Sequence, residues 1–203
     1  MLDNPFRVMP DTAEVDGVVY PINSDFRVMV SLETEVLSHG QTDVAGLLLA
    51  FYKGRVPDNI EGAVDAMIAF YKGAKSSFQG DKPAKNVREY DYRLDVDVLT
   101  ASFMGAYGID LSTAQMHWWT FRRLLLNLPH DSPFMQRVHY RTADVGKMDK
   151  SLQKHYRKMK NLYALQRNPA EGHMTVEERD AALKAKLQRR FEEAQKVEQQ
   201  DKG

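Results

Sequence analysis

The sequence predicts a mainly α-helical protein: a compact helical domain with a small N-terminal β-hairpin and a charged C-terminal helix. Apolar residues recur at the three- and four-residue spacing of amphipathic helices along most of the 203-residue chain. Capping residues and glycine stops separate these stretches. Strand-like alternation occurs in one short segment near residue 20. These patterns favour one helical domain over residues 1–166 and a charged helix over residues 167–203.

The hairpin is expected over residues 14–22. Asp16 and Gly17 suit a two-residue turn, which requires positive φ. Tyr20 and Ile22 alternate with Val19 and Pro21 in the second strand. Because proline cannot donate to a ladder, this strand is expected at a sheet edge.

Three amphipathic helices are expected between residues 24 and 73. Ser24 or Asp25 caps the first and Asp43 the second, while Gly54 and Gly73 each follow a lysine at a C-terminal end. Their apolar residues are Phe26, Met29, Val30, Val36 and Leu37, then Val44, Leu47, Leu48 and Phe51, then Val64, Met67, Ile68 and Tyr71. The similar segments 48–54 and 67–73 are too few for a solenoid and favour two similar helices packed as a hairpin.

A polar linker over residues 74–90 precedes the remaining helices. One helix runs from about residue 94 to 107 and stops at Gly108. The S-x-x-Q pattern at 112–115 predicts a capping box that opens the next helix, with Ala114, Trp118, Phe121, Leu125 and Leu128 on its apolar face. Ser132 and Pro133 start a short helix with Phe134 and Val138 as its apolar contacts. A basic helix follows over about 149–165, with Leu152, Tyr156, Met159 and Tyr163 as its stripe.

Composition excludes several classes of protein. The 43% apolar and 28% charged shares are typical of a globular chain, not a disordered one. The chain has no cysteine, which excludes disulfides, cysteine-ligated metals and thiol nucleophiles. The longest run without a polar residue, 44–51, is far below the ~20 residues of a membrane span. The first residues lack a cationic and an apolar region, so we expect no signal peptide and no membrane partner.

Charge is unevenly distributed along a chain that is neutral overall. Residues 1–140 carry 13 basic and 18 acidic side chains, and residues 141–203 carry 15 and 10. This modest excess is typical of solvated helices, so nucleic acid is not the expected partner. The alternative is a nucleic-acid surface formed by the cations of the basic helix. They are Lys147, Lys150, Lys154, Arg157, Lys158 and Lys160.

Few residues suggest chemistry. Asp91, Asp95 and Asp97 could hold a divalent cation, but acids at a helix N-terminus complement its dipole, which is the favoured interpretation. His117 is expected to donate to a backbone carbonyl rather than to act as a base. No zinc-binding histidine pair, phosphate-binding glycine loop or serine-nucleophile motif occurs. We therefore expect a protein that is not an enzyme, with no catalytic, metal or cofactor residues.

The densest aromatic patch is the HWWTF segment at 117–121. Adjacent helical tryptophans point about 100° apart, so one can fill the core while the other faces a partner. Core packing is the favoured interpretation, and a partner-binding hot spot is the alternative. The apolar stripe of the predicted C-terminal helix is narrow, so this helix is expected to dock weakly on the domain or to bind a partner. The candidate partner-binding residues are Trp118, Trp119, Phe121, Leu183, Leu187 and Phe191.

Four segments carry a resemblance to a known family. They are YPINSDFR at 20–27, FMGAYGIDL at 103–111, HWWTFR at 117–122 and YRKMKNLYAL at 156–165. In this order the chain resembles, over roughly residues 13–166, a family of small tailed-bacteriophage proteins of Gram-positive phages and prophages. Their genes lie between those of the major tail protein and the tape-measure protein. Residues 167–203 extend beyond the resemblance.

The resemblance implies a tail-assembly role in the host cytoplasm. Proteins encoded at this position are typically chaperones that bind the tape-measure protein, keep it soluble and recruit the major tail protein. They carry no established catalytic residues, so none is transferred to this chain. A homo-oligomer is compatible with this role. The alternative is a structural virion component, such as a tail-completion or head–tail connector subunit.

Overall fold

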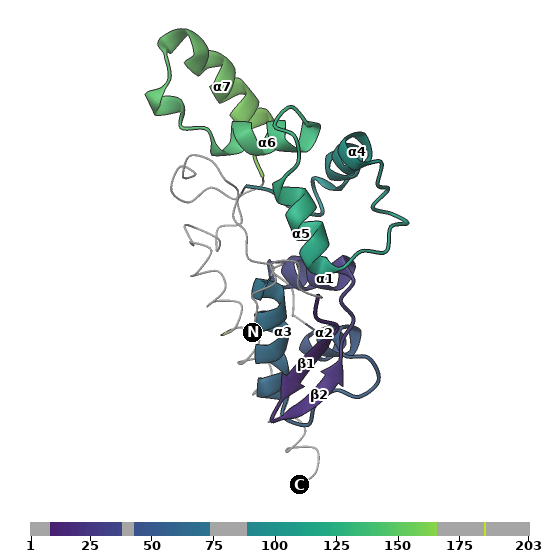
Figure 1. Cartoon of the computed structure of the whole chain (residues 1–203). Coiled ribbons are helices and arrows are strands. Elements are labelled where there is room, and N and C mark those ends of the chain that lie inside the picture. The colour runs from purple at the N-terminus through teal and green to yellow at the C-terminus, as the bar shows by residue number, and fades with distance from the viewer. Residues whose placement is uncertain (1–8, 38–42, 74–88, 166–184, 186–203) are drawn as a thin grey trace, which may run out of the picture. The chain divides into compact units, whose positions relative to one another are not determined.

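The computed structural model describes residues 9–37, 43–73, 89–165 and 185 (Figure 1). Contacts divide the described residues into two compact units. Unit 1 comprises residues 9–37, 43–73 and 115–123, and unit 2 comprises residues 89–114 and 124–165. Each unit therefore uses two stretches of chain that are separated by a stretch of the other. The fold is mainly α-helical with one small antiparallel hairpin, which confirms the predicted class.

Unit 1 begins with the predicted hairpin, strands β1 (Thr12–Val15) and β2 (Val18–Pro21). Val15 pairs with Val18, so Asp16 and Gly17 form the turn. Their φ angles of 52° and 76° are those that a two-residue hairpin turn requires. The hairpin packs against α3, as Figure 1 shows.

Three helices complete the first stretch of unit 1: α1 (Phe26–Leu37), α2 (Val44–Phe51) and α3 (Ile60–Gly73). Asp25 caps α1 by accepting from the Arg27 backbone N–H, and Asp43 caps α2 by accepting from Gly46. Helix α2 packs against both α1 and α3, as expected for the similar pair. Phe26 and Met29 of α1 are buried in the core of unit 1. The predicted apolar residues of α2 and α3 are buried there as well, except Tyr71, which is half-buried.

The sequence predicted the start of helix α5 wrongly. Helix α5 is Trp118–Leu126, so the S-x-x-Q pattern at 112–115, which was expected to open it, lies before the helix. Ser112 does not cap α5, because it is bonded to Asp110. The Asp110 carboxylate accepts from the Ser112 backbone N–H at 2.8 Å and from its hydroxyl at 2.6 Å. An isolated antiparallel bridge then pairs His117 with Asp25 in unit 1, with the Phe26 N–H donating to the Met116 carbonyl and the Trp118 N–H to the Ser24 carbonyl. The predicted apolar face is correct from Trp118 onward, since Trp118, Phe121, Leu125 and Leu128 are all buried.

Unit 2 contains α4 (Val96–Tyr107), α6 (Pro133–Thr142), the 3-10 helix η1 (Val145–Lys147) and α7 (Lys150–Leu162). Gly108 ends α4 in the left-handed conformation, with a φ of 66°, as predicted. Ser132 caps α6, and Phe134 and Val138 are buried, also as predicted. Helix α6 packs against α4 and α7. The division between the two units falls within α5, between Arg123 and Leu124.

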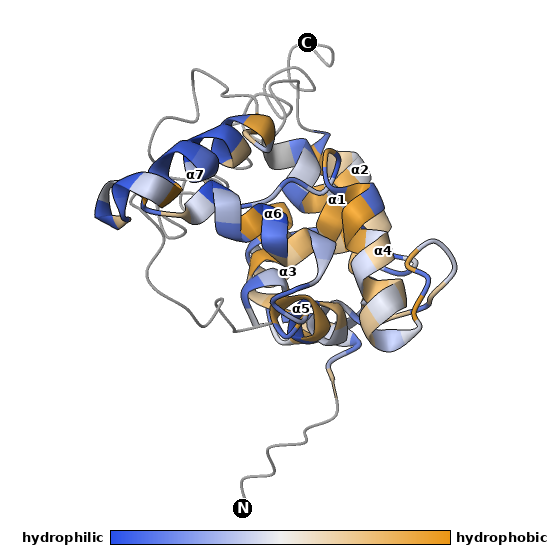
Figure 2. Ribbon diagram, turned by 90° about the horizontal axis from the view of Figure 1, so that it is seen from above, coloured by the Kyte–Doolittle hydropathy of each residue, from blue (hydrophilic) through white to orange (hydrophobic). Residues whose placement is uncertain are grey.

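Helix α7 differs from the others in hydropathy. Figure 2 colours most of α7 hydrophilic and α2 hydrophobic. No residue of α7 is buried, and the predicted stripe residue Leu152 is 50% exposed. Most of the predicted 74–90 linker and all but Ala185 of the predicted C-terminal helix lie outside the described residues.

Candidate functional site

The two tryptophans lie against the C-terminal end of α3. The indole N–H of Trp118 donates to the Tyr71 carbonyl at 3.1 Å, and that of Trp119 donates to the Phe70 carbonyl at 2.9 Å. The last four carbonyls of a helix have no partner within the helix. Adjacent indoles therefore satisfy two consecutive carbonyls of the last turn of α3.

Around this cap the aromatic rings are packed against one another. Trp118 stacks on Tyr71 with ring centroids 5.4 Å apart, and Phe121 stacks on Phe26 at 4.6 Å. Trp118 and Phe121 have 0% exposure, so neither offers surface to a partner in this structure. Trp119 is half-buried and stacks on Phe70. The other candidate partner-binding residues, Leu183, Leu187 and Phe191, lie outside the described residues.

His117 is a structural residue, in agreement with the sequence interpretation. Its Nδ1 accepts from the Trp119 backbone N–H at 3.0 Å, so the ring proton lies on Nε2. Nε2 lies 3.0 Å from the Pro10 carbonyl and donates to it. The imidazole thus links the chain before the hairpin to the start of α5, with both nitrogens engaged.

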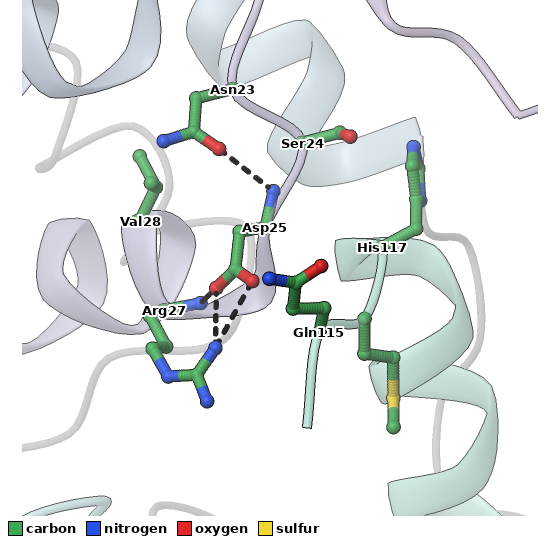
Figure 3. Close-up of a pocket in the computed structure, with 8 residues that line it drawn as sticks. Asn23, Ser24, Asp25, Arg27, Val28, Gln115 and His117 are labelled. Carbon is green, nitrogen blue, oxygen red and sulfur yellow. Dashed lines mark hydrogen bonds and ion pairs between the residues drawn. The ribbon is translucent and has the colours of Figure 1, made fainter. Parts of the chain in front are cut away.

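A pocket in unit 1 lies beside the same bridge (Figure 3). Its lining residues are Asn23, Ser24, Asp25, Arg27, Val28, Gln115, Met116 and His117. The Asp25 carboxylate accepts from the Arg27 backbone N–H at 2.9 Å and from its guanidinium at 3.1 and 3.2 Å, as the dashed lines show. The Asp25 carboxylate in this pocket therefore caps α1 and forms an ion pair with Arg27.

Unit 2 is organised around a buried ion cluster. Arg141 binds Asp95 with two guanidinium nitrogens, at 2.6 and 2.8 Å, and Arg137 adds a third contact at 3.2 Å. The Arg141 guanidinium also donates to the backbone carbonyls of Tyr163 and Glu89. Asp95 is 0% exposed and Arg141 is 5% exposed. One arginine thus ties four stretches of unit 2 together.

The electrostatics of Asp95 follow from this arrangement. Burial raises the pKa of its carboxyl, because a charge loses water there. Hydrogen bonds from Arg141, from the Asp91 backbone N–H and from Arg137 outweigh burial and hold the pKa below its ordinary value. Asp95 lies at the N-terminal cap position of α4, as the sequence favoured, but its side chain makes no capping bond and instead forms a paired core charge.

The sequence contains a signal for this cluster that the motif search missed. Phe134, Val138 and Arg141 follow the i, i+4, i+7 spacing of one helix face, so the arginine lies on the apolar face of α6. Glu33 lies in the same way on the apolar face of α1, where it is buried and accepts from the Tyr71 hydroxyl at 2.8 Å. A charged residue in a buried stripe indicates a buried partner.

Helix α7 is held to α6 by polar aromatic contacts. The Tyr156 hydroxyl lies 3.1 Å from His139 Nε2, and the Tyr140 hydroxyl lies 3.4 Å from His155 Nε2. The Tyr140 ring also meets that of Tyr156 at 5.3 Å. These contacts explain how a helix without a buried residue keeps its place in unit 2.

The exposed face of α4 carries few charges. Ala101, Met104 and Gly105 are exposed there, with Asp97 one turn earlier on the same face and Leu94 just before the helix. Met104 is 47% and Leu94 59% exposed. A Cβ added to Gly105 would meet no atom of the described ranges within 4 Å. The described part of unit 2 therefore offers an exposed, largely apolar helix face with an open backbone position.

Among the described residues, no group of three or more histidine, cysteine or acidic side chains is placed to hold a metal ion. No helix within these ranges is long and apolar enough to cross a membrane.

Comparison with known proteins identifies the family. Searches of curated proteins and of solved structures found no match to the chain. Residues 7–165, most of the chain, match the family described as "Bacteriophage Gp15 protein". This match covers all the described elements and the four segments that suggested a phage family. The chain therefore belongs to the bacteriophage Gp15 protein family.

Proposed function

We propose that this protein is a non-catalytic tail-assembly chaperone that binds the tape-measure protein in the host cytoplasm. The observation that carries the proposal is membership of a bacteriophage family over residues 7–165. The order of the four matching segments, which resembles that of proteins encoded beside the tape-measure gene, supports the finer assignment. In this proposal the protein forms no covalent bond and uses no metal or cofactor.

The exposed face of α4 is the proposed contact surface. A long helical client presents apolar residues that need cover before assembly, and an exposed apolar helix face can provide it. Met104 supplies a flexible apolar side chain, which adapts to varied partners. Gly105 lets a second helix approach the α4 backbone closely.

Gly105 also carries an energetic argument. A glycine inside a helix costs about 0.5–1 kcal/mol relative to alanine. No atom of the described residues lies within 4 Å of the position that an alanine Cβ would take at Gly105. The glycine thus lowers the stability of α4, and no packing contact within the described chain requires it. Close approach of a client helix to the α4 backbone would require a glycine at this position.

Co-expression with the tape-measure protein of the same phage tests the proposal. The protein should raise the soluble fraction of the client and co-purify with it. Met104→Glu should abolish both effects, because the charge must be buried in the complex. Leu49→Glu is the matched control, since Leu49 is an exposed apolar residue of α2 at 66% exposure, outside the proposed surface. Equal solubility of the client with and without the protein contradicts the chaperone role.

The alternative of a structural virion component has a separate readout. Mass spectrometry of purified particles should find the protein absent or far below the copy number of the major tail protein. Stoichiometric amounts in finished particles favour a tail-completion or connector subunit over a chaperone.

A further inference from the structure

We propose that the cationic face of α7 binds the phosphate backbone of nucleic acid. This face consists of Lys150, Lys154, Arg157 and Lys158, all exposed. The inference goes beyond the proposed chaperone role and uses a different surface of unit 2. The sequence alone did not favour nucleic acid, because its cation excess is modest; the placement of these side chains adds the missing information.

The structure separates this face from the neighbouring cations. Lys147 forms an ion pair with Asp144 at 3.1 Å, and Lys160 donates to the Ala143 carbonyl at 2.9 Å. The Lys147 pair is an exposed contact within the η1 region, and the Lys160 contact joins α7 to the end of α6. Arg157 donates to Gln153 Oε1 at 3.1 Å on the same helix and stays exposed. The four cations of the face lie at positions i, i+4, i+7 and i+8, which project from one side of a helix. The opposite side, which carries Tyr156, contacts α6.

The face is complementary to a polyanion. Helix α7 contains no acidic residue, so no carboxylate on the helix neutralises its cations. Like charges four residues apart, as in Lys150, Lys154 and Lys158, destabilise a helix by a few tenths of a kcal/mol per pair. No residue of α7 is buried to offset this cost. A bound row of anions would relieve it.

Geometry and composition favour phosphates over an acidic protein surface. Lys150 to Lys158 spans about 12 Å along the helix, at 1.5 Å per residue. Successive phosphates of one strand of duplex DNA rise about 3.4 Å each, so this length faces three to four phosphates. Protein interfaces are enriched in aromatic residues and depleted in lysine. The face has three lysines and no aromatic residue, which fits contacts to a backbone that carries no sequence information.

The test is the salt dependence of binding to a short fluorescein-labelled DNA duplex, followed by anisotropy with the full chain. Each phosphate contact contributes about −0.9 to the slope of log K against log salt. Lys154→Gln/Lys158→Gln should therefore flatten the slope by about 1.8. Between 50 and 200 mM salt the variant should lose roughly 12-fold less affinity than the unaltered protein.

Controls separate this result from unfolding and from general charge effects. Glutamine keeps helix propensity and removes like-charge repulsion, so the helical signal in circular dichroism should not fall. Lys53→Gln/Lys72→Gln removes two exposed lysines of unit 1 and should leave the slope unchanged.

Three outcomes overturn the proposal. The first is absence of binding at 50 mM salt. The second is an equal slope in the α7 variant and the unaltered protein. The third is displacement of the duplex by polyglutamate at equal charge concentration, which assigns the face to an acidic protein. A flattened slope with resistance to polyglutamate supports nucleic acid.

Discussion

The two units are stabilised in opposite ways. In unit 1 the buried polar contacts are mostly neutral: indole, imidazole and phenol groups bond to backbone carbonyls within an aromatic core. In unit 2 a carboxylate and two guanidinium groups meet at the centre. A neutral hydrogen bond depends little on pH near neutrality, whereas a buried ion pair requires one charge state. The two units thus differ in their buried polar contacts, because only unit 2 has a carboxylate–guanidinium pair at the centre of its described core.

The largest expected effect is in unit 2. Asp95→Ala removes the buried carboxylate and leaves Arg141 without its counter-charge, which should cost about 3–5 kcal/mol in the free energy of unfolding. Hydrogen exchange should rise in peptides of α4 and α6. The matched change Asp97→Asn alters an exposed acid of the same helix and should cost less than about 1 kcal/mol. Equal costs at the two positions would mean that the cluster does not hold unit 2.

A comparable loss should follow from Phe121→Ala in unit 1. The ring is fully buried and stacks on Phe26 and Trp118, so its removal should cost about 3–5 kcal/mol. Chemical denaturation followed by tryptophan fluorescence reports on this unit, because both tryptophans of the chain lie there. Leu49→Ala, at an exposed position, should stay within about 0.5 kcal/mol of the unaltered protein.

Two glycines sharpen the comparison through changes of opposite sign. A Cβ at Gly73 would lie 2.6 Å from Trp119 Cζ2, so Gly73→Ala should displace the indole that caps α3 and cost about 1–3 kcal/mol. Gly105→Ala in α4 meets open space and should stabilise unit 2 by about 0.5–1 kcal/mol. Thermal unfolding measures both. A destabilising Gly105→Ala would reveal a contact at that position.

The smallest effects are those of pH, and the two units should differ in direction. The pKa of Asp95 is lowered on folding, so its contribution to stability is present above about pH 4 and is lost as pH falls through the lowered pKa. Burial, with the Tyr20 charge, raises the pKa of Tyr52 to about 12, so its contribution is present below about pH 10 and is lost as pH rises toward 12.

Hydrogen exchange at low pH and phenolate absorbance at high pH measure these effects. Acid should loosen unit 2 before unit 1. In Asp95→Ala, unit 2 is already less stable at neutral pH, and its exchange should change less between neutral and acid pH. Tyr52, whose hydroxyl donates to the Ala63 carbonyl at 2.9 Å, should titrate later than an exposed tyrosine. Loss of unit 1 first in acid would reverse the comparison.

Patterns with a local physical cause could be predicted from the sequence. The hairpin turn at Asp16, the cap at Asp43 and the stop at Gly108 depend on the conformations of single residues. The start of α5 could not be predicted, because Asp110 accepts from Ser112, and Met116 and Trp118 bond to the backbone of Phe26 and Ser24, far earlier in the chain.

The candidate sites divide in the same way. His117 was assigned correctly because a partly buried histidine commonly donates to a carbonyl. The pairing of Asp95 with Arg141 depends on where α4 and α6 meet, which spacing along one helix does not specify. Likewise, only the structure shows that Lys147 pairs with Asp144 in η1 and that Lys160 donates to the Ala143 carbonyl.

The alternation of the two units along the chain has a consequence for biosynthesis. Residues 115–123 complete unit 1 only after the ribosome has made the first stretch of unit 2. Unit 2 in turn gains the Tyr163 carbonyl, which accepts from Arg141, only after residue 163 has been made. Neither unit can therefore fold completely before the later stretches of the chain are made. No single truncation of the chain yields one complete unit without part of the other.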